Sequence, residues 1–117
     1  MHELGLIFQV IKRVAPLAAE NQVDRILKVT LQIGEVSYVV PEYIEELFPD
    51  ACEGTPLEGC VLEIEPIKAR GKCRKCNRAF DILQFSGECP RCKEVDYDLI
   101  SGDEFLVKEV LIPEPEL

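Results

Sequence analysis

Two stretches of the chain repeat apolar residues with the spacing of an amphipathic helix. In the first, residues 4–18, apolar side chains recur every three or four positions, which predicts a helix with one buried face. These positions are Leu4, Ile7, Phe8, Ile11, Val14, Ala15 and Ala18. Pro16 falls inside the pattern. Because proline lacks a backbone N–H, we expect it to kink the helix or to end it near Ala15, with Asn21 as a cap.

The second helical pattern begins at Pro41, a residue well suited to the first turn of a helix. Acidic residues follow in the first turns, where they favour the positive end of the helix dipole: Glu42, Glu45 and Glu46. The buried face is predicted to comprise Ile44, Leu47, Phe48 and Ala51. Pro49 falls within this pattern, so we expect the helix to be short or distorted.

Three other segments alternate apolar and polar residues with the two-residue period of a β-strand. Residues 26–33 form the first, with Leu27, Val29, Leu31 and Ile33 on one face. Residues 60–67 form the second and contain Pro66, which favours a position at the edge of a sheet. The third spans residues 105–112.

These elements predict an α+β fold, in which two helices pack on a small three-stranded sheet and a separate module is inserted between the second and third strands. We accordingly divide the chain into an α/β body (residues 1–69), an insertion (70–100), and the closing strand of the body with its tail (101–117). The closing strand can join the sheet only if the insertion returns the chain close to its exit point.

The inserted segment contains two Cys-x-x-Cys pairs separated by twelve residues, a strong signal of a metal site. The pairs are Cys73 with Cys76, and Cys89 with Cys92. Four thiolates at one point suit tetrahedral zinc, and this closed shell leaves no position open for chemistry. We therefore predict a structural Zn(II) ion in a zinc ribbon that has short strands over residues 79–85 and 95–100.

The composition is typical of one globular domain: 117 residues, 47% hydrophobic and 30% charged, with a net charge of −9. No apolar run is long enough to span a membrane, and the start of the sequence does not resemble a signal peptide. We expect a cytoplasmic protein. Thiols stay reduced in the cytoplasm, so paired cysteines there indicate metal binding rather than disulfides.

The charge is uneven, because residues 68–93 hold eight basic and two acidic side chains, a local net charge of +6. One alternative function is therefore a zinc-ribbon module that contacts nucleic acid or a transcription partner. The favoured interpretation is that these cations offset the charge of the zinc–tetrathiolate centre. Base-stacking aromatic residues between the cysteines are limited to Phe80 and Phe85, which makes nucleic acid the weaker choice. An interrupting ribbon can also exchange between subunits, so a homo-oligomer stays open.

Two more cysteines, Cys52 and Cys60, lie outside the ribbon at positions with an apolar pattern. They are interpreted as ordinary buried thiols, with a further metal site or a redox pair as the alternatives.

His2 is the only histidine, and it directly follows the first residue. An exposed side chain on a frayed terminus is the usual fate of such a residue. The Met1 amine, the His2 amide nitrogen and the imidazole Nδ1 can nevertheless reach one metal ion together, closing two chelate rings, and Glu3 can add its carboxylate or its own amide nitrogen. A planar set of nitrogen and oxygen ligands favours Ni(II) or Cu(II).

We expect no enzymatic activity. With the one histidine near a terminus, no Ser-His-Asp or Cys-His arrangement has a positioned base. The sequence contains neither a P-loop nor a Gly-x-Gly-x-x-Gly motif.

Four signatures, in matching order along nearly the whole chain, resemble the HypA/HybF family of nickel metallochaperones for nickel-iron hydrogenase maturation. They are Met1-His2-Glu3-Leu4, the Ile-Gly-Glu-Val-Ser segment at 33–37, the two Cys-x-x-Cys pairs, and the Ser-Gly-Asp-Glu-Phe-Leu-Val-Lys-Glu segment at 101–109.

This resemblance implies that His2 is the essential Ni(II) ligand, used with nearby backbone nitrogens and supported by Glu3. It implies structural zinc at the four ribbon cysteines and a small α/β body with an inserted zinc ribbon. The implied partners are the HypB GTPase and the hydrogenase large-subunit precursor, with urease also served in some lineages. Some members place a further acidic ligand just after the first strand, where this chain has Val39-Val40-Pro41 and Glu42 is the nearest candidate.

Overall fold

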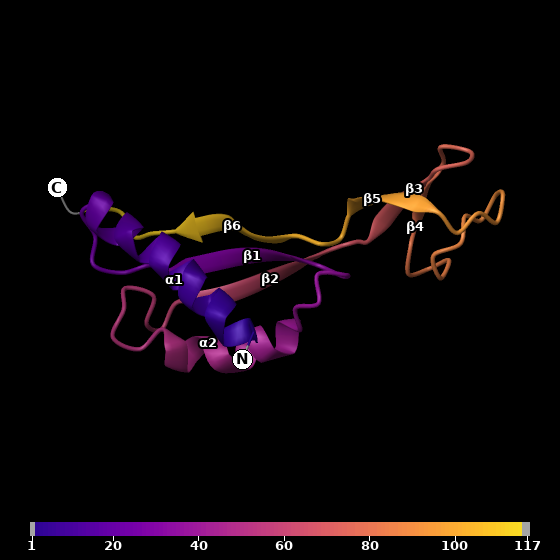
Figure 1. Ribbon diagram of the computed structural model, residues 1–117. Helices are drawn as coiled ribbons and strands as arrows, with labels where there is room; N and C mark the ends of the chain where they lie inside the picture. The colour runs from indigo at the N-terminus through magenta and orange to yellow at the C-terminus, as the bar shows by residue number, and fades with distance from the viewer. Residues whose placement is uncertain (1, 116–117) are drawn as a thin grey trace. The chain divides into compact units, whose positions relative to one another are not determined.

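The computed structural model describes residues 2–115, apart from the side chain of His2. Over this range the chain forms two helices, α1 (His2–Glu20) and α2 (Pro41–Ala51), and six strands (Figure 1). The strands are β1 (Lys28–Gly34), β2 (Val61–Ile67), β3 (Arg70–Cys73), β4 (Ala79–Asp81), β5 (Tyr97–Ser101) and β6 (Phe105–Leu111). They form two three-stranded sheets in the orders β2-β1-β6 and β4-β3-β5, which confirms the α+β class. Neither described helix combines the length and hydropathy needed to cross a membrane.

The chain divides into two compact units, which we call the body and the ribbon. The body comprises Met1–Gln32, Val39–Glu65 and Leu106–Leu117, and it contains both helices and most of the sheet β2-β1-β6. The ribbon comprises Ile33–Tyr38 and Pro66–Phe105 and contains the sheet β4-β3-β5. The chain therefore passes between the units near the ends of β1, β2 and β6.

In the body, β1 is the central strand of its sheet. At its start, the amide of Val61 donates to the carbonyl of Leu27, and the amide of Leu27 donates to the carbonyl of Leu111. The start of β1 thus lies beside the start of β2 and the end of β6, so β2 runs parallel to β1 and β6 runs antiparallel. Parallel neighbours need a long crossover connection, and α2 lies in the segment that supplies it.

Both helices continue through their prolines. Of the two alternatives predicted for Pro16, an end of α1 near Ala15 is therefore wrong, and a kink at Pro16 stays a prediction. The physical reason is packing, because buried apolar residues of α1 lie on both sides of Pro16: Ile7, Val10, Ile11, Val14 and Ala18. α1 ends at Glu20, and the side-chain Nδ2 of the next residue, Asn21, donates to the carbonyl of Leu17 at 2.7 Å. In α2, Ile44 and Phe48 are buried as predicted.

The ribbon sheet includes β3, a strand that the sequence analysis did not predict. It pairs antiparallel with both β4 and β5. At its centre, the absence of a side chain on Gly71 leaves room for the ring of Tyr97, which packs edge-to-face on Phe80 with ring centroids 5.7 Å apart. The strand was missed because its Arg-Gly-Lys-Cys sequence has neither β-branched nor aromatic residues.

Gly34, at the end of β1, lies against the backbone of Gly102 within the ribbon. A Cβ at position 34 would overlap the Gly102 carbonyl and stand 2.6 Å from the nitrogen of Asp103. Because the obstructing atoms are backbone, we expect Gly34→Ala to destabilise the protein by at least about 3 kcal/mol, measured as the change in the free energy of unfolding in urea.

Gly5→Ala is the matched control for that substitution, because an added Cβ in this first turn of α1 meets nothing within 4 Å. We expect it to stabilise the protein by about 0.5 kcal/mol through reduced backbone entropy of the unfolded chain. Equal free energies of unfolding for the two variants would contradict the close approach at Gly34.

Candidate functional site

The four ribbon cysteines are presented by two turns that have the same backbone hydrogen bonds. In the first, the amide of Cys73 donates to the carbonyl of Arg78, and the amide of Asn77 donates to the carbonyl of Cys73. In the second, Cys89 bonds to Glu94 and Lys93 bonds to Cys89 in the same way. The residue after the second cysteine of each pair has a positive φ, 63° at Asn77 and 67° at Lys93. Each turn therefore folds its two sulfurs toward one point.

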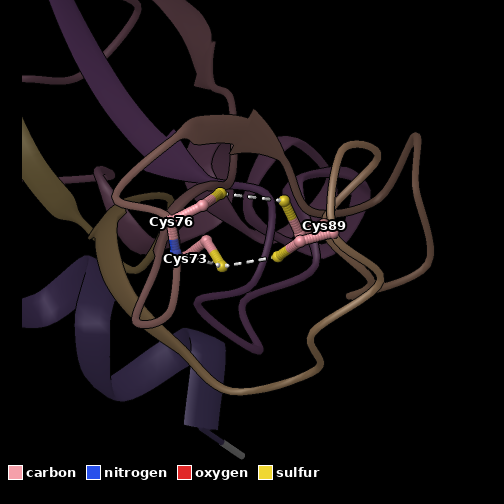
Figure 2. A group of neighbouring side chains, drawn as sticks. Cys73, Cys76 and Cys89 are labelled. Atoms are coloured by element: carbon pink, nitrogen blue, oxygen red, sulfur yellow. Dashed lines mark hydrogen bonds between the residues drawn. The ribbon is translucent and has the colours of Figure 1, made fainter.

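The four sulfurs converge between these turns. Cys73 lies 3.5 Å from Cys92 and Cys76 lies 3.6 Å from Cys89 (Sγ to Sγ), and all four Sγ atoms lie within 4.8 Å of one another. Figure 2 shows Cys73 and Cys76 on one side facing Cys89 on the other. A zinc ion bound at about 2.3 Å from each sulfur requires sulfur–sulfur separations of about 3.8 Å. The donor set and its spacing therefore fit tetrahedral zinc.

Backbone amides stabilise the thiolate form of the inner cysteines. The amides of Cys76 and Lys75 each donate to Cys73 Sγ at 3.4 Å, and these bonds hold the pKa of Cys73 below its ordinary value. The amides of Cys92 and Arg91 lower the pKa of Cys89 to about 6 in the same way. Thiolates are the form of cysteine that binds a metal, so these hydrogen bonds favour cation binding by the cluster.

The pKa of Cys92 is shifted in the opposite direction. The amide of Glu94 favours its thiolate, but burial and the neighbouring sulfurs of Cys73 and Cys89 outweigh this effect and raise the pKa of Cys92 to about 12. Several negative sulfurs at this distance repel one another, which opposes the thiolate form of Cys92. A divalent cation at the centre would offset this repulsion and favour the thiolates.

The cluster is also the core of the ribbon. Cys73 and Cys89 are fully buried and belong to one buried cluster with Ala69, Phe80 and Ile82. With so few apolar side chains, the ribbon buries too little surface to fold on hydrophobic packing alone. Metal binding and folding of the ribbon are expected to be linked for this reason.

The basic charge of residues 68–93 is neutralised within the ribbon. Counted over the whole unit, the ribbon has eight basic and eight acidic residues. β5 brings Asp98 beside the strand that precedes the first cysteine turn, and Arg74 pairs with Asp98 at 2.8 Å and with Asp96 at 3.4 Å. The segment 68–93 is basic, but the ribbon unit to which it belongs carries no net excess of positive charge.

The amino-terminal candidate site lies at the start of α1. Met1 is outside the described residues, and of His2 only the backbone is described, as the first residue of the helix. The first four N–H groups of any α-helix have no acceptor within the helix. A helix that begins at residue 2 therefore makes no hydrogen bonds with the amide nitrogens proposed as metal ligands, and these nitrogens stay available to a metal.

Glu3, the third residue of this candidate site, is 8% exposed. Its carboxylate accepts a hydrogen bond from the amide of Val40, at 3.5 Å, directly before α2 begins. This contact ties the first turn of α1 to the start of α2. Sequence reasoning missed it because the two residues are 37 positions apart and no local pattern connects them.

The whole chain is similar to proteins of one family. A family model described as "Hydrogenase/urease nickel incorporation, metallochaperone, hypA" matches residues 1–112. The chain is 41% identical over 114 residues to the protein of Rippkaea orientalis named hydrogenase maturation factor HypA, covering 97% of each chain. It is also 41% identical over 115 residues to the same-named protein of Trichodesmium erythraeum, again covering 97% of each.

Two solved structures share the fold. One is the solution structure of the Ni metallochaperone HypA from Helicobacter pylori, with a TM-score of 0.67, 22% identity and coverage of 97% of this chain and 98% of that one. The other, a solution structure of a HypA protein, has a TM-score of 0.72, 23% identity and coverage of 97% of each chain.

Proposed function

The chain belongs to the HypA family of nickel-incorporation metallochaperones, and from this we propose that it binds Ni(II) at its amino terminus and delivers it during maturation of nickel-iron hydrogenase. The observation that carries the proposal is the match over residues 1–112, which includes the Met1-His2-Glu3 start. Nickel is the cargo of this function, not a resident cofactor.

The proposed ligands are the Met1 amine, the His2 amide nitrogen and the His2 imidazole. These nitrogen donors close adjacent chelate rings and form the planar arrangement that Ni(II) accepts. Glu3 is assigned a supporting role. Its carboxylate is nearly buried and accepts a hydrogen bond from the Val40 amide. Glu3 can therefore hold the first turn of α1 in place while nickel binds at Met1 and His2.

Zn(II) is proposed for the cluster of Cys73, Cys76, Cys89 and Cys92. Zinc would supply a closed tetrahedral crosslink and no open coordination position. Hydrogen bonds from the backbone amides of Lys75 and Cys76 to Cys73 Sγ support its thiolate in this cluster. A site of this kind keeps its metal while the amino-terminal site exchanges its own, so the two metals have separate tasks.

We propose that the HypB GTPase and the hydrogenase large-subunit precursor are the partners of this transfer, which would take place in the cytoplasm. Ligands near a chain terminus can be displaced one at a time by the ligands of a partner. Such a transfer needs no bond to be made or broken in a substrate, so the protein is proposed to act without catalysis. The family description includes urease, which would be served by the same step.

The alternative of a nucleic-acid-binding zinc ribbon has less support. Nucleic-acid binding depends on an excess of positive charge. The ribbon has equal numbers of basic and acidic residues, and Arg74 is already paired with Asp96 and Asp98.

Nickel titration of untagged protein at two pH values tests the proposed function. At about pH 7.5 we expect one Ni(II) per chain in addition to zinc. At about pH 5.5 nickel affinity is expected to fall by at least about tenfold, because protons then occupy the imidazole, whose ordinary pKa is about 6.5. Zinc, measured in the same samples, should remain bound. Absence of nickel at the higher pH, or loss of both metals together, would refute the proposal.

A further inference from the structure

Two cysteines outside the zinc cluster line one cavity in the body. Cys52 caps the end of α2, and Cys60 directly precedes β2. The cavity has a volume of about 250 Å³ and is otherwise mostly apolar, with Phe48, Leu57 and Leu62 in its wall. Both thiols thus share one environment, although α2 and β2 are separate elements.

Both cysteines have free thiols in the wall of this one cavity, and each perturbs the pKa of the other. Cys52 is 1% exposed, whereas Cys60 is only partly buried. A reagent that enters the cavity therefore meets Cys60 first, with Cys52 behind it.

The loop between the cysteines is held in its conformation by its own hydrogen bonds. The hydroxyl of Thr55 donates to the carbonyl of Cys52 at 2.7 Å and accepts from the amide of Leu57 at 3.1 Å. The amide of Cys60 donates to the carbonyl of Leu57. Because Leu57 is fully buried, it anchors the loop in the core.

The chemistry of the cavity disfavours metal binding. Among the described residues, the zinc cluster is the only group of three or more potential ligands that converge. A metal would need both sulfurs as thiolates at the same time, and burial opposes this because it raises the pKa of the Cys52 thiol to about 12 and also raises that of Cys60. A disulfide is neutral, and burial does not oppose its formation in this way.

We propose that Cys52 and Cys60 form a redox modification site, separate from both metal sites, which a low-molecular-weight disulfide such as glutathione disulfide converts to an intramolecular disulfide. In the first step Cys60 loses its proton, and the small fraction present as thiolate attacks glutathione disulfide, forming a mixed disulfide and releasing one glutathione thiolate. In the second, Cys52 loses its proton and attacks Cys60 Sγ, releasing the other glutathione. The protein loses two electrons and two protons, and glutathione disulfide is reduced to two thiols.

The assignment of Cys60 as the attacking residue and Cys52 as the resolving one follows from exposure. Thiol–disulfide exchange needs access to the sulfur that is attacked and to the sulfur that attacks. Cys60 satisfies this condition for an external disulfide, whereas Cys52 satisfies it only for a sulfur already held at Cys60.

The experiment treats the zinc-loaded full chain with glutathione disulfide and follows intact mass, with zinc content as an internal check on the other four cysteines. For the unsubstituted protein we expect a loss of two hydrogens in mass, no retained glutathione, and unchanged zinc. Peptide mapping should place the new bond between Cys52 and Cys60.

Two single variants separate the roles of the cysteines. Cys52→Ala should accumulate one glutathione on Cys60, because no resolving thiol remains. Cys60→Ala should remain unmodified at Cys52, because that sulfur is buried. Circular dichroism and zinc content verify that both variants are folded.

Three results would overturn the proposal. One is a stable glutathione adduct on the unsubstituted protein, another is equal labelling of the two variants, and the third is oxidation of the zinc cysteines while Cys52 and Cys60 stay reduced. None of these results depends on nickel, so the failure of this proposal is distinguishable from failure of the proposed function.

Discussion

Replacement of His2 by alanine is expected to abolish specific Ni(II) binding while leaving zinc content and the fold unchanged. Substitutions in the outer shell of a metal site already cost about 10–100-fold in affinity, so the loss of a direct imidazole ligand should exceed about 100-fold. The fold is expected to survive because the buried apolar residues of α1 begin at Ile7, more than one helical turn after His2. Calorimetric titration with Ni(II) measures the loss.

A short extension before Met1 provides a second form of the same test. It converts the terminal amine to an amide and should weaken nickel binding as strongly as the substitution does, although His2 is still present. The matched control carries the same extension after Leu117, where it should have no effect. Full nickel affinity in both His2→Ala and the amino-terminal extension would show that nickel binds elsewhere in the chain.

Much of the body could be predicted from local patterns. The stripe that begins at Leu4 predicted α1, the alternation around Leu31 predicted β1, and the proline in β2 correctly indicated an edge strand. At Pro16 the local rule that proline kinks or ends a helix left two alternatives, and the end near Ala15 is wrong because buried residues on both sides of Pro16 keep the helix continuous. A sequence pattern that covers one helical turn does not show packing of this kind.

The candidate sites were predictable to different degrees for a related reason. The spacing of Cys73, Cys76, Cys89 and Cys92 is sufficient to predict convergence, because each pair is a local turn. The hydrogen bond from Val40 to Glu3 and the pairing of Arg74 with Asp98 join residues that are distant in the sequence. The net charge of residues 68–93 therefore overstates the net charge of the ribbon, because the fold adds acidic residues from outside this segment to the same unit.

Replacement of Cys89 by serine is expected to release zinc and unfold the ribbon. Cys89 is fully buried and belongs to the small core of this unit, which has few apolar residues to replace the metal. Structural zinc contributes about 10–16 kcal/mol of apparent binding free energy in zinc-finger peptides, and that contribution is a folding free energy. The measurement is zinc content together with the dispersion of ribbon amide resonances in the nuclear magnetic resonance spectrum.

The loss should extend into the body, because the ribbon closes a loop between two strands of its sheet. The amide of Glu35 donates to the carbonyl of Ile67, and the amide of Gly34 donates to the carbonyl of Glu104. These bonds hold the beginning and the end of the long ribbon segment beside the same point, the end of β1. If that segment, of about 40 residues, unfolds, closing it as a flexible loop costs up to about 3 kcal/mol, and the body should lose that much stability in urea.

Cys60→Ala is the control for this effect, since it removes a cysteine that lies outside the zinc cluster. It should keep full zinc content and the dispersed ribbon resonances of the unsubstituted protein. If Cys89→Ser also kept that dispersion after losing zinc, the ribbon would fold on its apolar contacts alone. A second informative result is nickel binding by Cys89→Ser. Because the proposed nickel ligands lie in the body, binding should persist wherever the body remains folded, and its loss in a folded body would show that the two metal sites are coupled.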